Sequence, residues 1–202
     1  MSRLFDKYIF YADFHKNKWN KLVHYFCIPA LAWTLFIFCN YIPFSFSPIQ
    51  TKLLLPICNN CVLSFRPSTI LLLLYHVYYL YLHLVVGFFS LIFYSILWYT
   101  SNIFYCQIDY AWIWAIGIHV FSWILQIAGH RICEGNQPAF ITGAVQSFLM
   151  APIFVVYDWC MYVGIVDRPE YLDHINNKNK RRNSDNDIDS DSDIIDYSSL
   201  ME

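Results

Sequence analysis

Two short segments of the chain hold the side chains best suited to chemistry. The first reads HKNKWNKLVH and contains His15, Asn20 and His24. Asn17 is a favourable N-cap for a helix beginning at Lys18. On such a helix Asn20 and His24 are four residues apart and share a face. His15 would lie just before the cap, near the same helix end.

The second segment reads QIAGHRICE and contains Gln126, His130 and Glu134. His130 and Glu134 are four apart, a spacing that places an imidazole beside a carboxylate on a helix. Imidazole and carboxylate suit iron, zinc or manganese, and two histidines with one carboxylate suit non-haem ferrous iron. The spacing therefore indicates a metal site to which both segments contribute. The alternative is that the two segments hold separate polar residues at a membrane interface.

The composition indicates where these segments lie. The chain has 202 residues, enough for one domain, and is 57% hydrophobic and 20% aromatic but only 14% charged. Soluble domains carry roughly 25% charged residues. Residues 22–166 contain six charged side chains, too few to cover a soluble surface. This distribution argues against a soluble enzyme, a disordered protein and a nucleic-acid binder.

A helix needs about 20 apolar residues to cross a bilayer. Four uncharged runs meet that need, and tyrosines and tryptophans gather at their ends, as in an aromatic belt; the runs are 22–51, 67–108, 110–130 and 135–157. The second run is long for one span, so we expect two short spans, 68–84 and 87–104, joined by a turn near Gly87. The predicted fold is all-α, a polytopic helical membrane protein with four to five transmembrane or re-entrant helices.

The basic residues predict the orientation of the chain. Five lysines and arginines precede the first span and five follow the last, so both termini are expected in the cytoplasm. Because this requires an even number of crossings, we expect residues 138–165 to be re-entrant or interfacial. Four crossings between the two polar segments would place them on the same side of the membrane, whereas three would separate them. One shared site therefore requires two spans within 68–104.

Three regions follow from these patterns. Residues 1–21 form a cytoplasmic N-terminal segment, residues 22–166 a helical membrane domain, and residues 167–202 a cytoplasmic tail. From about residue 176 the tail is a basic cluster followed by alternating acids, a composition typical of disorder.

The remaining reactive side chains favour structural interpretations. His76, His83 and His119 lie within apolar runs, where a histidine is either functional or hydrogen-bonded to a neighbouring helix. The Cys58–Cys61 pair has metal-site spacing, but no second pair completes it. Two rival functions stay open: a membrane scaffold or assembly protein without enzymatic activity, and a small transporter using the three histidines.

Residues 11–33 (YADFHKNKWNKLVHYFCIPALAW) and 122–154 (SWILQIAGHRICEGNQPAFITGAVQSFLMAPIF) resemble the 2-hydroxy fatty acid dioxygenase family. The resemblance implies an integral protein of the endoplasmic reticulum membrane that uses Fe²⁺ and dioxygen. Its members shorten a 2-hydroxy fatty acid by one carbon in α-oxidation, which in fungi serves phytosphingosine and sphingolipid breakdown. The implied partners are this acid, dioxygen and membrane lipid, without nucleic acid.

The resemblance also implies roles for individual residues. The iron ligands would be His15, His24, His130 and Glu134, the last three being catalytic. Asn20 and Gln126 would hold these ligands in place. Lys21 or Arg131, or the neighbouring Lys16 and Lys18, could bind the substrate carboxylate. The alternative for these four cations is solvated charge flanking the membrane.

Overall fold

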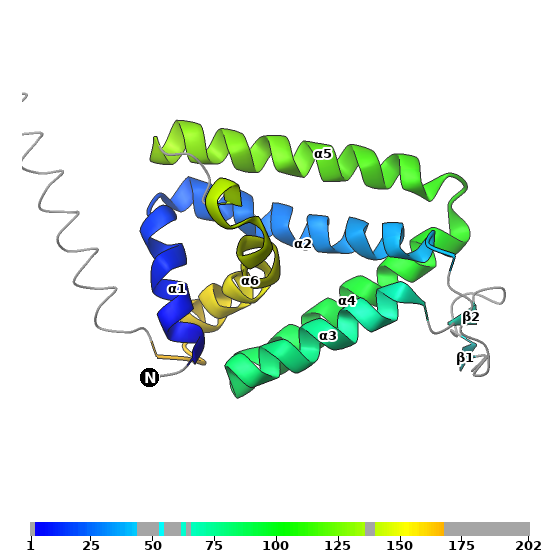
Figure 1. Cartoon of the computed structure of the whole chain (residues 1–202), viewed down its shortest axis with the longest axis horizontal. Coiled ribbons are helices and arrows are strands. Elements are labelled where there is room, and N and C mark those ends of the chain that lie inside the picture. Colours follow the sequence, from blue (N-terminus) through cyan, green and yellow to red (C-terminus); the bar gives the residue numbers. More distant parts are fainter. Residues whose placement is uncertain (1–2, 44–52, 55–61, 64–65, 136–139, 168–202) are drawn as a thin grey trace, which may run out of the picture.

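The computed structural model describes residues 3–43, 53–54, 62–63, 66–135 and 140–167. In order, the elements are α1 (Arg3–Phe14), α2 (Lys18–Asn40), β1 (Leu53–Leu54), β2 (Val62–Leu63), α3 (Pro67–Leu82), α4 (Leu84–Gln107), α5 (Ala111–Gly129), the π-helix η1 (His130–Glu134) and α6 (Phe140–Tyr162). The prediction of a helical protein is confirmed. The two short strands pair antiparallel at the end of the bundle farthest from α1 (Figure 1).

Helix α2 begins where its cap predicts. The Asn17 side chain accepts a hydrogen bond from the Trp19 backbone N–H at 2.8 Å, and helical geometry starts at Lys18. From there α2 extends along the molecule beside α5 (Figure 1). Thr34 Oγ1 lies 2.8 Å from His119 Nδ1, and Asn20 lies beside His130, so the two helices run antiparallel.

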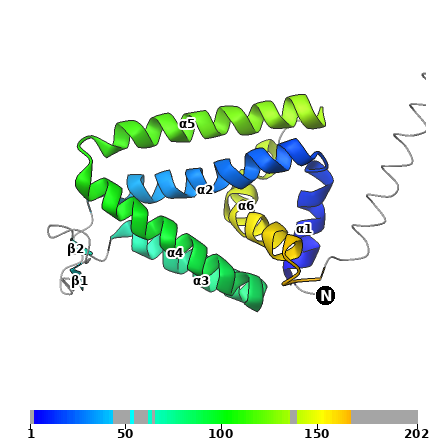
Figure 2. The same cartoon turned by 180° about the vertical axis from the view of Figure 1, so that it is seen from behind.

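The second apolar run forms the expected pair of helices. Helices α3 and α4 lie side by side, as Figure 2 shows from behind. The turn is the single extended residue His83, and Gly87 lies inside α4 rather than at the turn. A Cβ at Gly87 would come within 2.7 Å of backbone atoms of Tyr79 and Leu80. Glycine is therefore needed here for the close approach of the two helices.

Three helical segments are long and apolar enough to cross a membrane: α2, α4, and α5 together with η1. Helix α3 and residues 148–162 are shorter apolar helices. Large apolar side chains are exposed along the outer surfaces, among them Leu74 and Val77 of α3 and Trp114, Phe121 and Ile124 of α5. An apolar surface of this extent is typical of contact with lipid.

The middle of helix α6 packs against the other helices. Its residues 152–158 are all buried, and nearly all of them are apolar. A helix that is apolar all round is one surrounded by protein or lipid. Here Tyr8 of α1 packs on Phe154, and Tyr94 of α4 donates a hydrogen bond to the Pro152 carbonyl at 3.0 Å. Whether residues 138–165 are re-entrant or interfacial stays a prediction.

The bundle end away from α1 is joined by a buried polar network. Ser68 donates to Asn40 Oδ1 at 2.6 Å, and Asn40 Nδ2 donates to Asn102 Oδ1 at 3.2 Å. Trp98 Nε1 donates to Ser68 at 3.3 Å. These bonds connect α2, α3 and α4, and they give the buried polar side chains of the network hydrogen-bond partners.

Candidate metal centre

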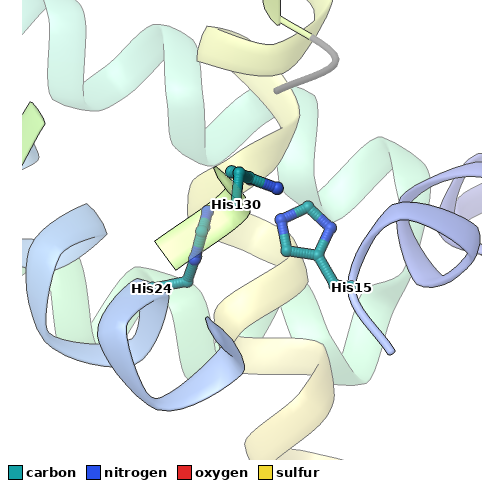
Figure 3. A group of neighbouring side chains, drawn as sticks. All are labelled: His15, His24 and His130. Carbon is teal, nitrogen blue, oxygen red and sulfur yellow. The ribbon is translucent and has the colours of Figure 1, made fainter. Parts of the chain in front are cut away.

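Three histidines from three parts of the chain meet beside α1. His15 lies between α1 and α2, His24 on α2, and His130 at the start of η1 (Figure 3). One ligand nitrogen from each lies within 4.8 Å of the other two. All three residues are buried, with exposed fractions of 7%, 4% and 3%. The helices between His24 and His130 thus return the chain to the same end of the molecule, as a shared site requires.

Two of the imidazoles are held in a metal-binding tautomer. His15 Nδ1 lies 2.8 Å from the Tyr11 carbonyl oxygen, and His24 Nδ1 lies 2.8 Å from that of Asn20. A carbonyl oxygen only accepts, so each Nδ1 carries the hydrogen and each Nε2 keeps its lone pair. This is how histidines that bind metals are commonly oriented.

His15 Nε2 fits a metal ligand on two further grounds. The atom is buried and has no hydrogen-bond partner among the described residues. Leaving a buried acceptor unpaired is unfavourable, whereas a metal ion would satisfy it. Burial, reinforced by nearby His24, holds the pKa of His15 well below its usual value. The ring is therefore neutral, which ligation requires.

Asn20 connects the histidines with the carboxylate. It is fully buried, and its Nδ2 lies 3.5 Å from His130 Nδ1 and 3.1 Å from Glu134 Oε1. Its side chain therefore bridges α2 and η1 at the site. Its backbone carbonyl also accepts the hydrogen of His24.

Glu134 lies beside this bridge and outside the close group of ligand nitrogens. Its Oε1 accepts hydrogen bonds from the Asn17 backbone N–H at 2.8 Å and from Asn20. Residues 130–134 form a π-helix in place of the predicted α-helix, and both His130 and Glu134 lie against the Asn20 amide. In a π-helix the hydrogen bonds run between residues five apart, so side-chain directions differ from those of an α-helix.

Gln126 and Gly129 lie on the face of α5 that packs against α2. Gln126 is buried, and its Nε2 has no hydrogen-bond partner within the described part of the chain. The antiparallel register places it level with Val23 and His24. A Cβ at Gly129 would lie 2.8 Å from Asn20 Oδ1, so the glycine permits the Asn20 bridge.

The two predicted substrate-binding cations differ in their surroundings. Arg131 is exposed. Lys21 Nζ lies 3.9 Å from Asp158 Oδ2, and Asp158 is buried in α6. Asp158 also accepts hydrogen bonds from Tyr8 and, at 3.0 Å, from Tyr25. The sequence analysis did not predict a role for this carboxylate. The one sequence signal for it is that Asp158 interrupts an apolar stretch.

Tyr11 was also missed, although it lies directly against the site. Its ring stacks on His15 with centroids 3.9 Å apart and an interplanar angle of 20°. Burial, with Asp158 nearby, holds the pKa of Tyr11 well above its usual value, so the phenol keeps its proton. The sequence offered no signal for this residue beyond its place one helical turn before His15.

The other histidines that the structure describes, His76, His83 and His119, do not join the centre. Trp123 Nε1 donates to His119 Nε2 at 3.2 Å, so His119 Nδ1 carries the hydrogen and donates to Thr34. His119 thus makes one hydrogen bond between helices, to Thr34 of α2, as in the structural interpretation, and one within α5. His83 Nδ1 accepts from the Val86 N–H as the cap of α4, and His76 is buried in α3. Cys58 and Cys61, and the tail from residue 168, lie outside the described residues.

A family model described as 2-hydroxy-palmitic acid dioxygenase Mpo1-like matches residues 1–163. The chain belongs to this family. The Mpo1-like match spans all three histidines and Glu134. The chain is 24% identical over 159 residues to 2-hydroxy-palmitic acid dioxygenase MPO1 of Saccharomyces cerevisiae, covering 79% of this chain and 80% of the yeast protein. No solved structure matches the chain.

Proposed function

We propose that the protein is an iron(II)-dependent dioxygenase that shortens 2-hydroxy fatty acids by one carbon. The observation that carries this proposal is the buried group of three histidine nitrogens in a chain of the Mpo1-like family. Imidazole ligands suit iron, and a set of three leaves positions for oxygen ligands. Ferrous iron, when bound, would activate dioxygen and orient the two reactants.

The surrounding residues hold this ligand set. The Tyr11 and Asn20 carbonyls fix the rings of His15 and His24 through their Nδ1 hydrogens. The Asn20 amide lies against His130 and is itself held by Glu134. We therefore assign Glu134 to the support of Asn20 in place of direct ligation. Such supporting bonds are worth 10- to 100-fold in the metal affinity of other proteins.

Gln126 and Lys21 have proposed roles nearer the substrate. The buried Gln126 amide, level with His24, is a donor for a group at the centre. The ion pair of Lys21 with Asp158 is long, at 3.9 Å, so Lys21 is able to approach an entering carboxylate. Arg131, exposed at the same end, would attract the acid before it enters.

The overall reaction balances with dioxygen as the oxidant. A 2-hydroxy acid and dioxygen give the acid shorter by one carbon, carbon dioxide and one water. The substrate is a membrane lipid, and exposed apolar surface along the helices would contact its chain. We place the protein in the endoplasmic reticulum membrane with both termini in the cytoplasm, where this reaction would serve sphingolipid breakdown.

The test uses purified protein loaded with ferrous iron and given 2-hydroxypalmitate labelled with ¹³C at C1. Pentadecanoate and labelled carbon dioxide should form in equal amounts. His24→Ala and His130→Ala should each lose both the bound iron and this activity. The matched control is His119→Ala, which removes a half-buried histidine away from the centre and should retain iron.

Two outcomes would contradict the proposal: wild-type protein that binds no iron, or turnover that survives in both ligand variants. A transporter predicts the opposite sensitivity, with substrate movement lost in His119→Ala and retained in His24→Ala. A scaffold predicts no bound metal in any variant.

A further inference from the structure

The phenol of Tyr11, whose ring stacks on His15, is a buried hydrogen-bond donor without a partner among the described residues. Tyr11 is 7% exposed, and its hydroxyl makes no hydrogen bond within the described part of the chain. Its ring is fixed between two others, His15 on one side and Phe154 at 4.8 Å. The phenol is therefore held in place by packing and not by a bond of its own.

Four other buried or half-buried tyrosines have hydrogen-bond partners. Tyr79 donates to the Leu149 carbonyl and Tyr94 to that of Pro152, each at 3.0 Å. Tyr8 and Tyr25 both donate to Asp158. Buried hydroxyls are bonded in the large majority of cases, so an exception calls for an explanation.

The nearby His15 Nε2 indicates what kind of group the Tyr11 hydroxyl would bind. Tyr11 stacks on His15, whose Nε2 is also buried and unpaired. One of these two atoms is an acceptor suited to a metal, and the other is a donor suited to an oxygen bound beside that metal. A carboxylate entering this buried region must be met by donors. Lys21 and Arg131 are both more exposed than Tyr11, so these cations would meet the acid as it enters and the buried phenol would hold it at the centre.

We propose that Tyr11 donates its phenol hydrogen to the carboxylate of the 2-hydroxy acid bound at the three-histidine centre. This inference rests on the proposed function. It adds a residue that favours substrates with a carboxylate over those without one. A hydrogen bond to a charged acceptor is stronger than one between neutral groups, and its orientation would fix which end of the lipid lies at the metal.

The test is binding without turnover. Iron-loaded wild-type protein and Tyr11→Phe are titrated with radiolabelled 2-hydroxypalmitate in the absence of dioxygen. Phenylalanine keeps the stacked ring and removes only the hydroxyl. We expect iron content to be unchanged and the acid to bind about tenfold more weakly, as expected for one lost bond to a charged group. Hexadecane-1,2-diol, which lacks the carboxylate, should bind both proteins equally.

The matched control is Tyr94→Phe, which removes a buried phenol bonded to Pro152 and should leave acid binding unchanged. Equal affinity of wild type and Tyr11→Phe for the acid would overturn the role of Tyr11 and leave the proposed function standing. Loss of iron from Tyr11→Phe would also overturn it, since the phenol would then support the metal. Wild-type protein that binds iron but not the acid would overturn the proposed function together with this inference.

Discussion

At the scale of single residues, the nitrogen that would bind a metal differs from the nitrogen that fixes the imidazole ring in place. His15 and His24 each use Nδ1 on a backbone carbonyl of the preceding helical turn, at 2.8 Å. These acceptors belong to the main chain, so substitution of a neighbouring side chain leaves them in place. His130 differs, because the neighbour of its Nδ1 is the side chain of Asn20. The centre should therefore be most sensitive to substitution at Asn20.

We predict that Asn20→Ala lowers iron affinity by about 10- to 100-fold, because it removes the group that bridges His130 and Glu134. It also leaves the Glu134 carboxylate with one hydrogen bond fewer, at a cost in folding free energy of about 1–3 kcal/mol. Iron per protein after dialysis against a graded chelator series measures the first effect. Thermal unfolding measures the second.

Asn40→Ala is the matched control. Asn40 is also a buried asparagine of α2, but it bonds Ser68 and Asn102 at the opposite end of the helix. It should lower the melting temperature comparably and leave the iron affinity unchanged. Equal iron affinity in the two variants would show that Asn20 has no particular role at the centre.

At the scale of elements, the packing of α2 against α5 and η1 sets the distance between the histidines. Gly129 ends α5 where that helix touches Asn20. The chain then changes from an α-helix to a π-helix, which places His130 at the centre and directs Glu134 toward Asn17. The geometry of the site thus depends on Gly129, which has no side chain, and on the change from the α-helix α5 to the π-helix η1.

We predict that Gly129→Ala weakens iron binding, because the new Cβ would lie 2.8 Å from Asn20 Oδ1 and displace that amide. Gly117→Ala is a control on the same helix, since nothing lies within 4 Å of its Cβ position. Gly117→Ala should be neutral or stabilise the protein by up to about 1 kcal/mol through helix propensity. Iron titration and thermal unfolding of both proteins provide the comparison, and a normal iron affinity in Gly129→Ala would contradict it.

The sequence predicted the elements better than it predicted the site. Apolar run lengths give the helices, and Asn17 gives the start of α2, since both depend on local chemistry. The turn between α3 and α4 was placed near Gly87 instead of at His83, because glycine also serves close packing. The histidines could be named from their spacing and the family resemblance. The support of Asn20 by Glu134 depends on the π-helix. The roles of Tyr11 and Asp158 depend on contacts made by α1, which no local sequence pattern predicts.

At the scale of the whole molecule, the bundle has two different ends. The metal centre, α1 and Arg131 lie at one end. The turn from α4 to α5 and the paired strands lie at the other (Figure 1). If α2 to α5 cross the membrane in succession, these two ends face opposite compartments.

We predict that single cysteines replacing Lys16 and Arg131 react with a membrane-impermeant thiol reagent from the same side of sealed vesicles. A cysteine replacing Asp109 should react only from the opposite side. All three residues are exposed, so access alone does not distinguish them. The host is a variant in which the seven native cysteines are replaced. Labelling of positions 16 and 131 from opposite sides would contradict a shared centre on one membrane face.

The hydrogen bonds of Asp158 have a consequence for the order of events during synthesis. They join α6 to Tyr8, near the start of the chain and 150 residues earlier. His130 likewise meets Asn20 across 110 residues. His15 and His24 are therefore synthesised long before His130, the third histidine of the centre. If the proposed function holds, iron would be bound firmly only after nearly the whole helical region has been made, so metal loading would report that assembly is complete.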